Sequence, residues 1–266
     1  MNEKLANLKT TLRNYGSLAV AFSGGVDSTF LLKVAQDVLD DQVLAVTIRS
    51  PLFPHRESQE ALKFVTDNQI PHETIDMWEQ DMEGFADNPP NRCYLCKRRL
   101  FSQVIDLAHE MSIPHVADGS NVDDLSDYRP GIQALRELGV VSPLQEAQMT
   151  KRNIRQLSRD MNLPTWNKPT LACLASRFPY GHRISKDKLL AVDQAEQFLK
   201  SQGFRQVRVR HHGDTARIEV GPEERTRFFD AGLMDCIYEA FQRLGFTYTA
   251  LDLKGYRMGS MNETIT

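Results

Sequence analysis

A short glycine-rich stretch near the N-terminus carries the residue types that hold phosphate groups. The letters SGGVDS, residues 23–28, directly follow the apolar run at residues 18–22 and precede a stretch with helical apolar spacing. Glycines let the backbone turn its N–H groups inward as an anion-binding nest, and the positive end of the following helix points at the same place. The hydroxyl groups of Ser23 and Ser28 add neutral donors. The spacing matches neither a Walker A loop nor a dinucleotide-binding fold, which indicates a different kind of phosphate site.

Cysteines form the second group of residues that could do chemistry. Cys93 and Cys96 stand three positions apart at the start of a helical pattern, beside basic residues that favour thiolate over thiol. Alone, this pair fits half of a zinc site, a redox pair, part of an iron–sulfur site or a chance pair. Cys173 lies in the irregular segment 167–183, and three thiolates that leave one position open suit a 4Fe–4S cluster or a zinc ion. Cys236, which lies among apolar residues with helical spacing, is expected to be a buried core residue.

The first 145 residues alternate β-rich runs with helical stretches, a pattern that predicts a parallel sheet wrapped by crossover helices. Ligands of such sheets bind beyond the carboxyl ends of the strands, which is where the glycine-rich loop lies. After Thr150 a basic helix leads into the irregular segment, and we place the domain boundary there. The predicted fold class is α/β, a doubly wound parallel sheet over residues 1–170 with a smaller C-terminal α+β domain over residues 171–266. Strands of the sheet are expected at residues 18–22, 43–48, 73–77, 115–118 and 140–144.

The C-terminal part shows a helical pattern, two strands, a second helical stretch and a last strand. These elements are expected at residues 188–202, 207–212, 215–220, 222–244 and 248–253. Arg208 and Arg210 alternate along one strand, so they share a face and are candidates for a phosphate clamp; the alternative is a pair of solvated surface charges. The segments FLKSQGF and AFQRLGF both precede a strand, which indicates either a duplicated unit or two helices that each end at a glycine.

Composition excludes several classes of protein. With 266 residues, of which 41% are apolar, the chain can bury a core, so disorder, collagen and coiled coil are excluded. The formal charge of −3 provides no global attraction to nucleic acid or to an anionic membrane, so any phosphate site must be local. The N-terminus lacks an apolar core for export, and four cysteines are too few for a disulfide scaffold. We therefore expect a cytoplasmic protein without a membrane or nucleic-acid partner.

The glycine-rich loop resembles the PP-loop of ATP pyrophosphatases, enzymes that cut ATP between its α and β phosphates and adenylate a substrate oxygen. The resemblance implies that Asp27 helps to hold Mg²⁺ on the pyrophosphate and that the end of the second strand lies beside the adenine. It also implies a fourth-strand loop at residues 118–124, for which an ordinary Asx-rich turn is the alternative. The implied ATP-binding residues are Ser23, Gly24, Gly25, Asp27, Ser28, Ser50, Asp118 and Gly119.

Motifs along nearly the whole chain resemble the LarE family of sulfur transferases. They are SGGVDST, DYRPG (127–131), WNKP (166–169), SRFPYG (176–181) beside Cys173, VRVRHH and LDLKGYR. Members of that family make the nickel-pincer nucleotide cofactor. ATP adenylates a carboxylate of pyridinium-3,5-biscarboxylic acid mononucleotide, and sulfur then replaces the activated oxygen to give a thiocarboxylate. The resemblance therefore implies a small-molecule pyridinium dicarboxylate mononucleotide as substrate.

The family resemblance implies two possible sulfur donors. In one branch the cysteine that matches Cys173 attacks the acyl adenylate, loses its sulfur and becomes dehydroalanine. In the other branch three cysteines hold a 4Fe–4S cluster that carries an extra sulfide, and the presence of Cys93 and Cys96 resembles this branch. Under the second hypothesis Cys173 is a cluster ligand, which puts its sacrificial role in doubt, and the source of the sulfide is open.

Further basic residues are candidates for charge stabilisation. Arg177 and Lys97 could neutralise charge that develops at phosphate or carboxylate, with a surface cation as the alternative for each. The resembled family places the arginines matching Arg208 and Arg210, and the glutamate matching Glu196, near the substrate or an oligomer interface. The resemblance thus assigns the C-terminal domain to substrate binding and to assembly of a homo-oligomer.

Three other functions share parts of this pattern. A PP-loop, 4Fe–4S-dependent tRNA thiolase would use nearly the same activation chemistry, but the acidic charge balance and the lack of a basic appended domain disfavour it. An amide-forming ATP pyrophosphatase has no use for three converging cysteines. A non-catalytic nucleotide sensor would keep SGGVDS and tolerate the loss of Cys173.

Overall fold

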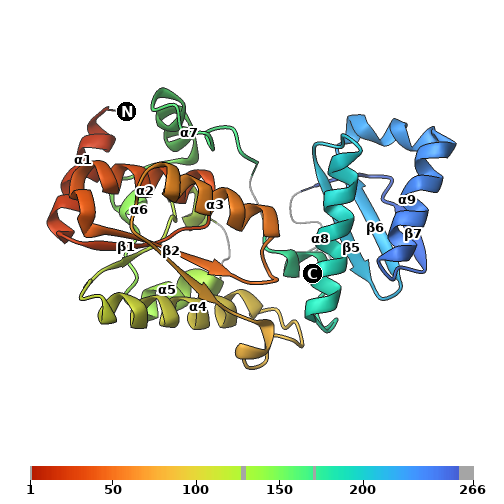
Figure 1. Cartoon of the computed structure of the whole chain (residues 1–266), viewed down its shortest axis with the longest axis horizontal. Helices are drawn as coiled ribbons and strands as arrows, with labels where there is room; N and C mark the ends of the chain where they lie inside the picture. The colour runs from red at the N-terminus through yellow and green to blue at the C-terminus, as the bar shows by residue number, and fades with distance from the viewer. Residues whose placement is uncertain (1, 127–129, 170–171, 258–266) are drawn as a thin grey trace. The chain divides into compact units, whose positions relative to one another are not determined.

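The computed structural model describes residues 2–126, 130–169 and 172–257, which form two compact units (Figure 1). The first unit comprises Met1–Glu83 and Asn91–Leu171, and the second comprises Gly84–Pro90 and Ala172–Thr266. Within the described ranges, every helix is too short or too polar to cross a membrane.

The first unit is built on a parallel sheet of four strands. Its strands are β1 (Leu18–Ala21), β2 (Val43–Arg49), β3 (His72–Asp76) and β4 (Val116–Ala117), in the order β3-β2-β1-β4. The predicted α/β class with a parallel sheet is therefore confirmed. The fifth predicted strand, residues 140–144, is wrong: only Val141 makes a bridge, to Ala117. Pro143 begins a helix there, because proline lacks an N–H for a strand ladder and its fixed φ suits a first helical position.

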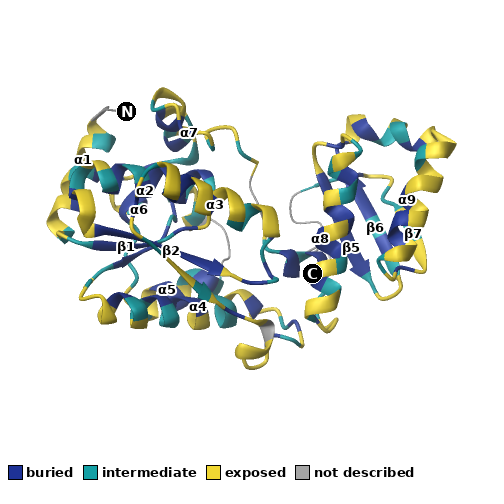
Figure 2. Cartoon of the chain, in the orientation of Figure 1, coloured by how far each residue is buried: buried dark blue, intermediate teal, exposed yellow. Residues whose placement is uncertain are grey.

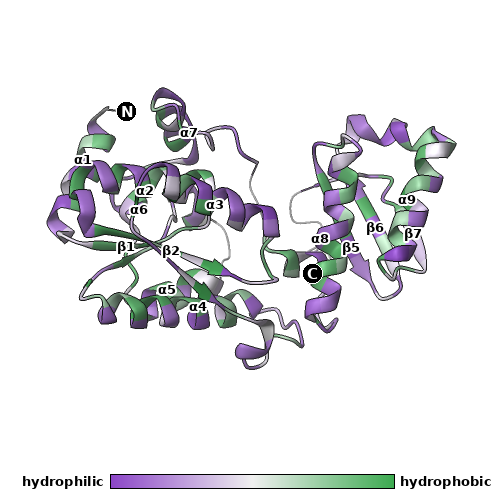
Figure 3. Cartoon of the chain, viewed as in Figure 1, coloured by the Kyte–Doolittle hydropathy of each residue, from purple (hydrophilic) through white to green (hydrophobic). Residues whose placement is uncertain are grey.

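Helices cover both faces of this sheet, as in a doubly wound fold (Figure 1). A large apolar core joins β1 and β2 to α1 (Asn2–Tyr15), α2 (Val26–Leu39), α3 (His55–Asp67) and α7 (Lys151–Asp160). The helices α4 (Arg92–Glu110) and α5 (Pro130–Glu137) pack together against the opposite face, and α6 (Pro143–Glu146) is short. Figure 2 shows β1 and β2 buried, and Figure 3 shows α7 mainly hydrophilic. The buried side chains of α7 are Ile154, Leu157 and Ser158, so this polar helix packs on the core through a narrow stripe of residues.

Short 3-10 helices connect several elements of the first unit. They are η1 (Asp40–Gln42), η2 (Glu79–Asp81) and η3 (Val122–Ser126), and the last of these follows β4.

The second unit is a small α+β arrangement. A three-stranded sheet contains β5 (Val207–His212), β6 (Thr215–Val220) and β7 (Tyr248–Leu251), with β6 in the centre, antiparallel to β5 and parallel to β7. It is accompanied by η4 (Leu174–Arg177), α8 (Lys186–Ser201), η5 (Pro222–Phe229) and α9 (Ala231–Arg243). The helical stretch expected at residues 222–244 is thus divided, because Asp230 caps α9 by accepting a bond from the N–H of Leu233 at 2.8 Å.

Residues 84–90 pack with the second unit, although they lie within the range expected for the first domain. Their backbone binds the segment after η4: the N–H of Gly181 donates to the carbonyl of Asn88 at 3.0 Å, and that of Ile184 to the carbonyl of Ala86 at 2.8 Å. The Asn88 side chain is fully buried and donates to the carbonyl of Pro179 at 2.7 Å. These are long-range bonds that local composition does not reveal.

Both helices of the second unit that precede a strand end in the same way. Gly203 and Gly245 have φ of +84° and +94°, the left-handed conformation that favours glycine. The next residue of each, Phe204 or Phe246, is buried and returns a backbone bond to the last helical turn, which is a Schellman motif. The glycine stop predicted from the sequence is present in both segments, and each leads into a strand that pairs with β6.

The prediction that Cys236 is a buried core residue is wrong, since this cysteine is exposed. The buried side of α9 consists of Ile237, Ala240 and Phe241. Cys236 precedes this stripe by one residue, about 100° around the helix, so it faces away from the core.

Candidate functional site

The glycine-rich loop lies at the carboxyl end of β1 and leads directly into α2. Gly24 has φ of +67°, and a Cβ atom added there would lie 3.0 Å from the Cβ of Ala61 on α3. Gly25 is the N-cap of α2, and the hydroxyl oxygens of Ser23 and Ser28 lie 3.0 Å apart across the loop. The backbone N–H groups of the first helical turn have no intrahelical acceptors. The structure therefore brings the predicted loop residues together in a turn at the start of a 14-residue helix, an arrangement that suits an anion.

The loop that follows β4 passes over the first turn of α2. A Cβ atom on Gly119 would lie 3.1 Å from the backbone nitrogen of Ser28, so only glycine permits this approach without displacement. Asp118 is buried and accepts hydrogen bonds from the hydroxyls of Ser120 and, at 2.7 Å, Ser142. Asp118 and Gly119 thus lie beside the glycine-rich loop, as the sequence predicts.

Lys97 extends from α4 toward the same place. Its Nζ atom lies 3.8 Å from Oδ2 of Asp118. Its aliphatic stem crosses Gly131 on α5, where an added Cβ atom would come within 2.8 Å of the Lys97 Cδ. Gly131 is the last residue of the motif DYRPG, of which residues 127–129 lie outside the described residues. The ammonium of Lys97 is therefore directed at the buried carboxylate beside the loop.

Ser50 follows β2 and is buried. Its hydroxyl oxygen accepts a long bond, 3.3 Å, from the N–H of Leu52, and its carbonyl accepts one from Phe53 at 3.1 Å. Ser50 shapes the turn at the carboxyl end of this strand, so its observed role is local.

Asp27, on the first turn of α2, pairs with Lys151 at the start of α7. Burial raises the pKa of Asp27 above its ordinary value, and Lys151 partly opposes this rise. Its other oxygen, Oδ1, is buried and has no hydrogen-bond partner among the described residues. Mg²⁺ in nucleotide sites is held by one or two carboxylates together with phosphate oxygens. A buried, unengaged carboxylate oxygen beside an anion-binding turn fits this donor set.

Lys151 was not among the residues predicted from the sequence. It stands 124 positions from Asp27, and its backbone N–H donates to Oδ2 of Asp123 at 2.8 Å. Thr150 is the N-cap of α7 and forms a capping box with Asn153. This cap fixes Lys151 as the first residue of the helix.

Lys168, from the motif WNKP, reaches the glycine-rich loop from another direction. Its Nζ atom donates to the carbonyl of Gly24 at 3.0 Å and pairs with Glu57 and Glu60 on α3. Arg155 on α7 donates to the carbonyl of Lys168 at 2.8 Å. The motif suggested family membership but not this contact, which joins residues 144 positions apart.

Cys93 and Cys96 are the second and fifth residues of α4, three positions apart and thus on one side of the helix. Cys93 is exposed and Cys96 is partly exposed, so both sulfur atoms are near the surface of the first unit. Cys173 belongs to the second unit. Among the residues that the structure describes, no three His, Cys, Asp or Glu side chains are close enough together to hold a metal ion.

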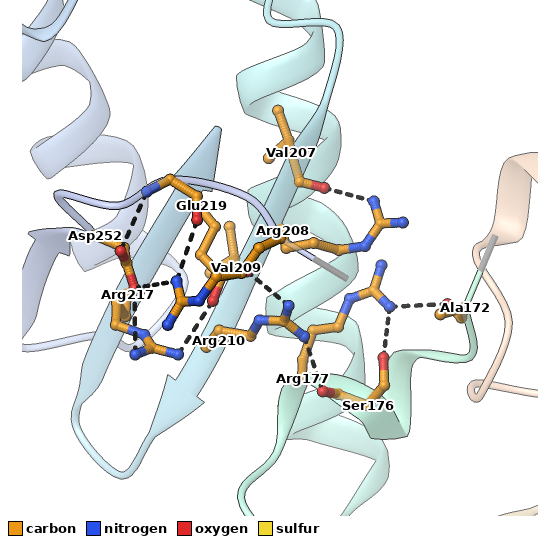
Figure 4. Close-up of polar contacts among 12 residues, drawn as sticks. Ala172, Ser176, Arg177, Val207, Arg208, Val209, Arg210, Arg217, Glu219 and Asp252 are labelled. Atoms are coloured by element: carbon orange, nitrogen blue, oxygen red, sulfur yellow. Dashed lines mark hydrogen bonds and ion pairs between the residues drawn. The ribbon is translucent and has the colours of Figure 1, made fainter. Parts of the chain in front are cut away.

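Cys173 is the N-cap of η4, and its sulfur accepts a bond from the N–H of Ala175 at 3.3 Å. Arg177, which is only 1% exposed, donates from Nη1 to the carbonyls of Ala172 and Cys173 at 2.8 and 3.1 Å. Figure 4 shows its contact with Ala172. The same guanidinium donates to both carboxylate oxygens of Glu196, at 2.8 and 3.0 Å. Burial disfavours its charge, but Glu196, with a smaller contribution from Cys173, outweighs this effect and raises the pKa of Arg177.

Arg208 and Arg210 are both buried, so the alternative of solvated strand charges is wrong. Arg210 donates to the carbonyl of Ser176 at 3.0 Å and to Glu219 at 2.6 Å. The guanidinium of Arg208 lies over the ring of Tyr256, 5.2 Å from its centroid. Burial lowers the pKa of Arg208, and the neighbouring Arg177 lowers it further. We call this group the arginine cluster; it comprises Arg177, Arg208, Arg210, Arg217, Glu196 and Glu219. Figure 4 shows its four arginines together with Glu219.

Comparisons with known proteins agree with this geometry. Residues 1–89 match the NAD synthase family model. The chain is 40% identical to the pyridinium-3,5-bisthiocarboxylic acid mononucleotide synthase of Lactiplantibacillus plantarum, over 99% of this chain and 95% of that protein. It is 42% identical to an uncharacterized protein of Synechocystis sp., over 100% of this chain and 99% of that one. A weaker similarity, 26% over 62% of this chain and 56% of the other, extends to one subunit of a glutamine-hydrolyzing GMP synthase from Methanococcus maripaludis. Because the first two relatives align over nearly their full length, the chain belongs to the LarE family of PP-loop sulfur transferases.

Proposed function

We propose that the protein is an ATP-dependent sulfur transferase in nickel-pincer nucleotide cofactor synthesis. It adenylates a carboxylate of pyridinium-3,5-biscarboxylic acid mononucleotide and converts it to a thiocarboxylate. The observation that carries this proposal is the 40% identity to a named synthase over 99% of the chain. The geometry of the glycine-rich loop supports it independently, because the loop has the features of a pyrophosphate site.

The first half-reaction forms an acyl adenylate. A carboxylate oxygen attacks the α-phosphorus of ATP, and pyrophosphate leaves with the electrons of the broken bond. In our proposal the N–H groups and hydroxyls of residues 23–28 hold the pyrophosphate, and Oδ1 of Asp27 is available for Mg²⁺. Bound Mg²⁺ would neutralise phosphate charge. Lys97, which is directed toward Asp118, would supply a further cation at this edge of the sheet.

The second half-reaction transfers sulfur. A sulfur nucleophile attacks the acyl carbon, and AMP leaves with the former carboxylate oxygen. AMP is a far better leaving group than oxide, which is why activation must precede transfer. We assign the arginine cluster to recognition of the substrate phosphate, with Arg208 and Arg210 as donors; Glu196, which pairs with Arg177, and Glu219, which pairs with Arg210, supply the counter-charges. The contacts of Arg177 favour a role through Cys173, whose backbone carbonyl it holds, rather than direct neutralisation of phosphate charge.

We further propose that Cys93, Cys96 and Cys173 are ligands of a 4Fe–4S cluster. The residue types fit, since two of the thiols share one helical turn and the third accepts a backbone N–H close to a guanidinium. When bound, the cluster would supply the transferred sulfur. A sacrificial Cys173 is the competing hypothesis. The assembly of a homo-oligomer through the second unit stays a prediction, and the source of the sulfide is open.

The deciding experiment measures ATP-dependent pyrophosphate release with the dicarboxylate mononucleotide as acceptor. Asp27→Asn should lower this release by at least about 100-fold, an effect expected when a charged group at a reacting phosphate is removed. Asp37→Asn is the matched control, because Asp37 lies on the same helix and pairs with Lys33 at the surface. Wild-type release by Asp27→Asn would exclude the loop assignment, and release that does not depend on the dicarboxylate would exclude the substrate.

The sulfur donor is decided by iron and acid-labile sulfide content after reconstitution without oxygen. If the protein holds a 4Fe–4S cluster, we expect about four iron atoms per chain, and we expect the variant Cys93→Ala to lose them. Cys236→Ala is the control that should keep them, because this exposed cysteine lies on α9. No iron in the wild type, together with a loss of about 34 Da at Cys173 after turnover, would instead establish the sacrificial route.

A further inference from the structure

Lys168 is held tightly beside the glycine-rich loop. Its ammonium group has three partners: the Gly24 carbonyl at 3.0 Å, Glu60 at 2.9 Å and Glu57. Its side chain is only 13% exposed. Two of these contacts are hydrogen bonds, to Gly24 and Glu60, and the third is an ion pair with Glu57, so the ammonium is held from several sides. Lys168 therefore acts on the loop through the carbonyl that it binds.

The bound carbonyl determines where the next N–H points. In a planar trans peptide the C=O of Gly24 and the N–H of Gly25 point in opposite directions. When Lys168 holds the carbonyl on the α3 side, the N–H of Gly25 is directed away from α3 and into the loop. There it lies 3.4 Å from the hydroxyl oxygen of Ser23, a contact too long to be a strong hydrogen bond. This N–H is thus aimed at the place where a phosphate oxygen would accept it.

The peptide between Gly24 and Gly25 needs an external anchor. Glycine on both sides gives the peptide plane more rotational freedom than any other pair of residues would. The anchor itself is fixed at both ends, since Arg155 binds the Lys168 carbonyl and α3 binds its ammonium. Burial raises the pKa of Glu60, but bonds from Lys168 and Arg56 outweigh it and hold the pKa below its ordinary value, so the carboxylate stays charged.

We infer that Lys168 is a positioning residue of the pyrophosphate site. By holding the carbonyl of Gly24, it keeps the Gly25 N–H directed at the pyrophosphate portion of ATP. This inference rests on the proposed function only in taking ATP as the ligand of the loop; it does not depend on the acceptor or on the sulfur donor.

The test compares binding of inorganic pyrophosphate with Mg²⁺ by calorimetry in the wild type and in Lys168→Met. We expect the dissociation constant, and the KM for ATP, to rise about 10- to 100-fold, the usual consequence of losing one hydrogen bond to a charged group. The value of kcat should fall less than KM rises, and Lys168→Arg should restore part of the affinity. Lys63→Met is the matched control, because Lys63 also pairs with a carboxylate on α3 but is 75% exposed.

A simple loss of positive charge would give a different result. A charge effect should fade as salt rises from about 0.05 to 0.5 M, whereas a misdirected N–H should weaken binding at both concentrations. The double variant Lys168→Met/Glu57→Gln removes the carboxylate left without its cation, so that folding is maintained. Wild-type affinity in this double variant, or a defect that disappears at high salt, would overturn the inference. If the wild type binds pyrophosphate but transfers no sulfur, the proposed function fails while the role of Lys168 is still tested.

Discussion

Replacing Arg177 by methionine should destabilise the second unit strongly. Its guanidinium and the carboxylate of Glu196 are 1% and 2% exposed and share two hydrogen bonds, of 2.8 and 3.0 Å. Removal of the cation leaves a buried carboxylate whose remaining bond from the described backbone is the Val209 N–H at 3.0 Å. Breaking a buried ion pair from one side costs about 3–5 kcal/mol in free energy of unfolding. That corresponds to a fall of about 10 °C in the melting temperature of a chain of this size.

A double-mutant cycle measured by urea denaturation separates the pair from its parts. Glu196→Gln should also destabilise, because it leaves the Arg177 cation buried. The combination Arg177→Met/Glu196→Gln contains neither charge, and its amide can still accept from Val209. We therefore expect it to be more stable than the sum of the single variants predicts, by about 2–3 kcal/mol.

The control for this cycle is an exposed ion pair in the same unit. Arg243 and Glu239 on α9 are each 69% exposed and lie 3.8 Å apart. Arg243→Met should change the free energy of unfolding by less than about 1 kcal/mol. If Arg177→Met were equally harmless, Arg177 would not be a structural cation, and direct action on the substrate would become the better explanation of its presence.

Two further predictions concern other buried sites. Burial between two phenylalanine rings, with a smaller effect from a nearby lysine, lowers the pKa of His211 to about 4. The imidazole of the unfolded chain binds its proton near pH 6.5, so the contribution of His211 to the free energy of unfolding should be full above that pH and decline as the pH falls toward 4. The variant His211→Phe should flatten this decline. An unchanged dependence of stability on pH in that variant would refute the prediction. Gly119→Ala places a Cβ atom 3.1 Å from the backbone nitrogen of Ser28, so it should raise the KM for ATP several-fold. Gly232→Ala on α9, which has more space, should leave that KM unchanged.

The sheet and the loop were predictable because both are local in sequence. The strands β1, β2 and β4 are apolar or β-branched runs next to a polar turn, and the observed bounds of all four strands differ from the predicted ones by at most one residue at either end. The exception at residues 140–144 has a local cause, since Pro143 favours a helix start over a strand. The prediction for Cys236 is wrong for a related reason. Apolar neighbours in a helical sequence do not show which side of the helix is buried, because successive residues are rotated by about 100° around the helix axis.

The arginines of β5 show where strand periodicity is insufficient. Arg208 and Arg210 share a face as expected, but that face is buried with Glu219 and Arg177. An alternating pattern of valine and arginine is typical of a half-exposed strand, so burial of both faces requires counter-charges that lie elsewhere in the chain. Glu219 comes from the neighbouring strand, and no local pattern in β5 could have indicated it.

The cations around the glycine-rich loop come from far along the chain, yet the local sequence around Lys151 indicates that this lysine needs a carboxylate partner. Lys151 and Arg152 open α7, whose first turn has no acidic residue. The N-terminus of a helix is its positive end, where each cation is unfavourable by about 0.3–1 kcal/mol. A helix that begins with two cations therefore needs carboxylates or a bound anion close by, and Asp27 and Asp123 meet that need for Lys151. Such a helix start, in a chain whose glycine-rich loop is predicted to bind phosphate, is a reason to look for the partner carboxylates within the loop itself.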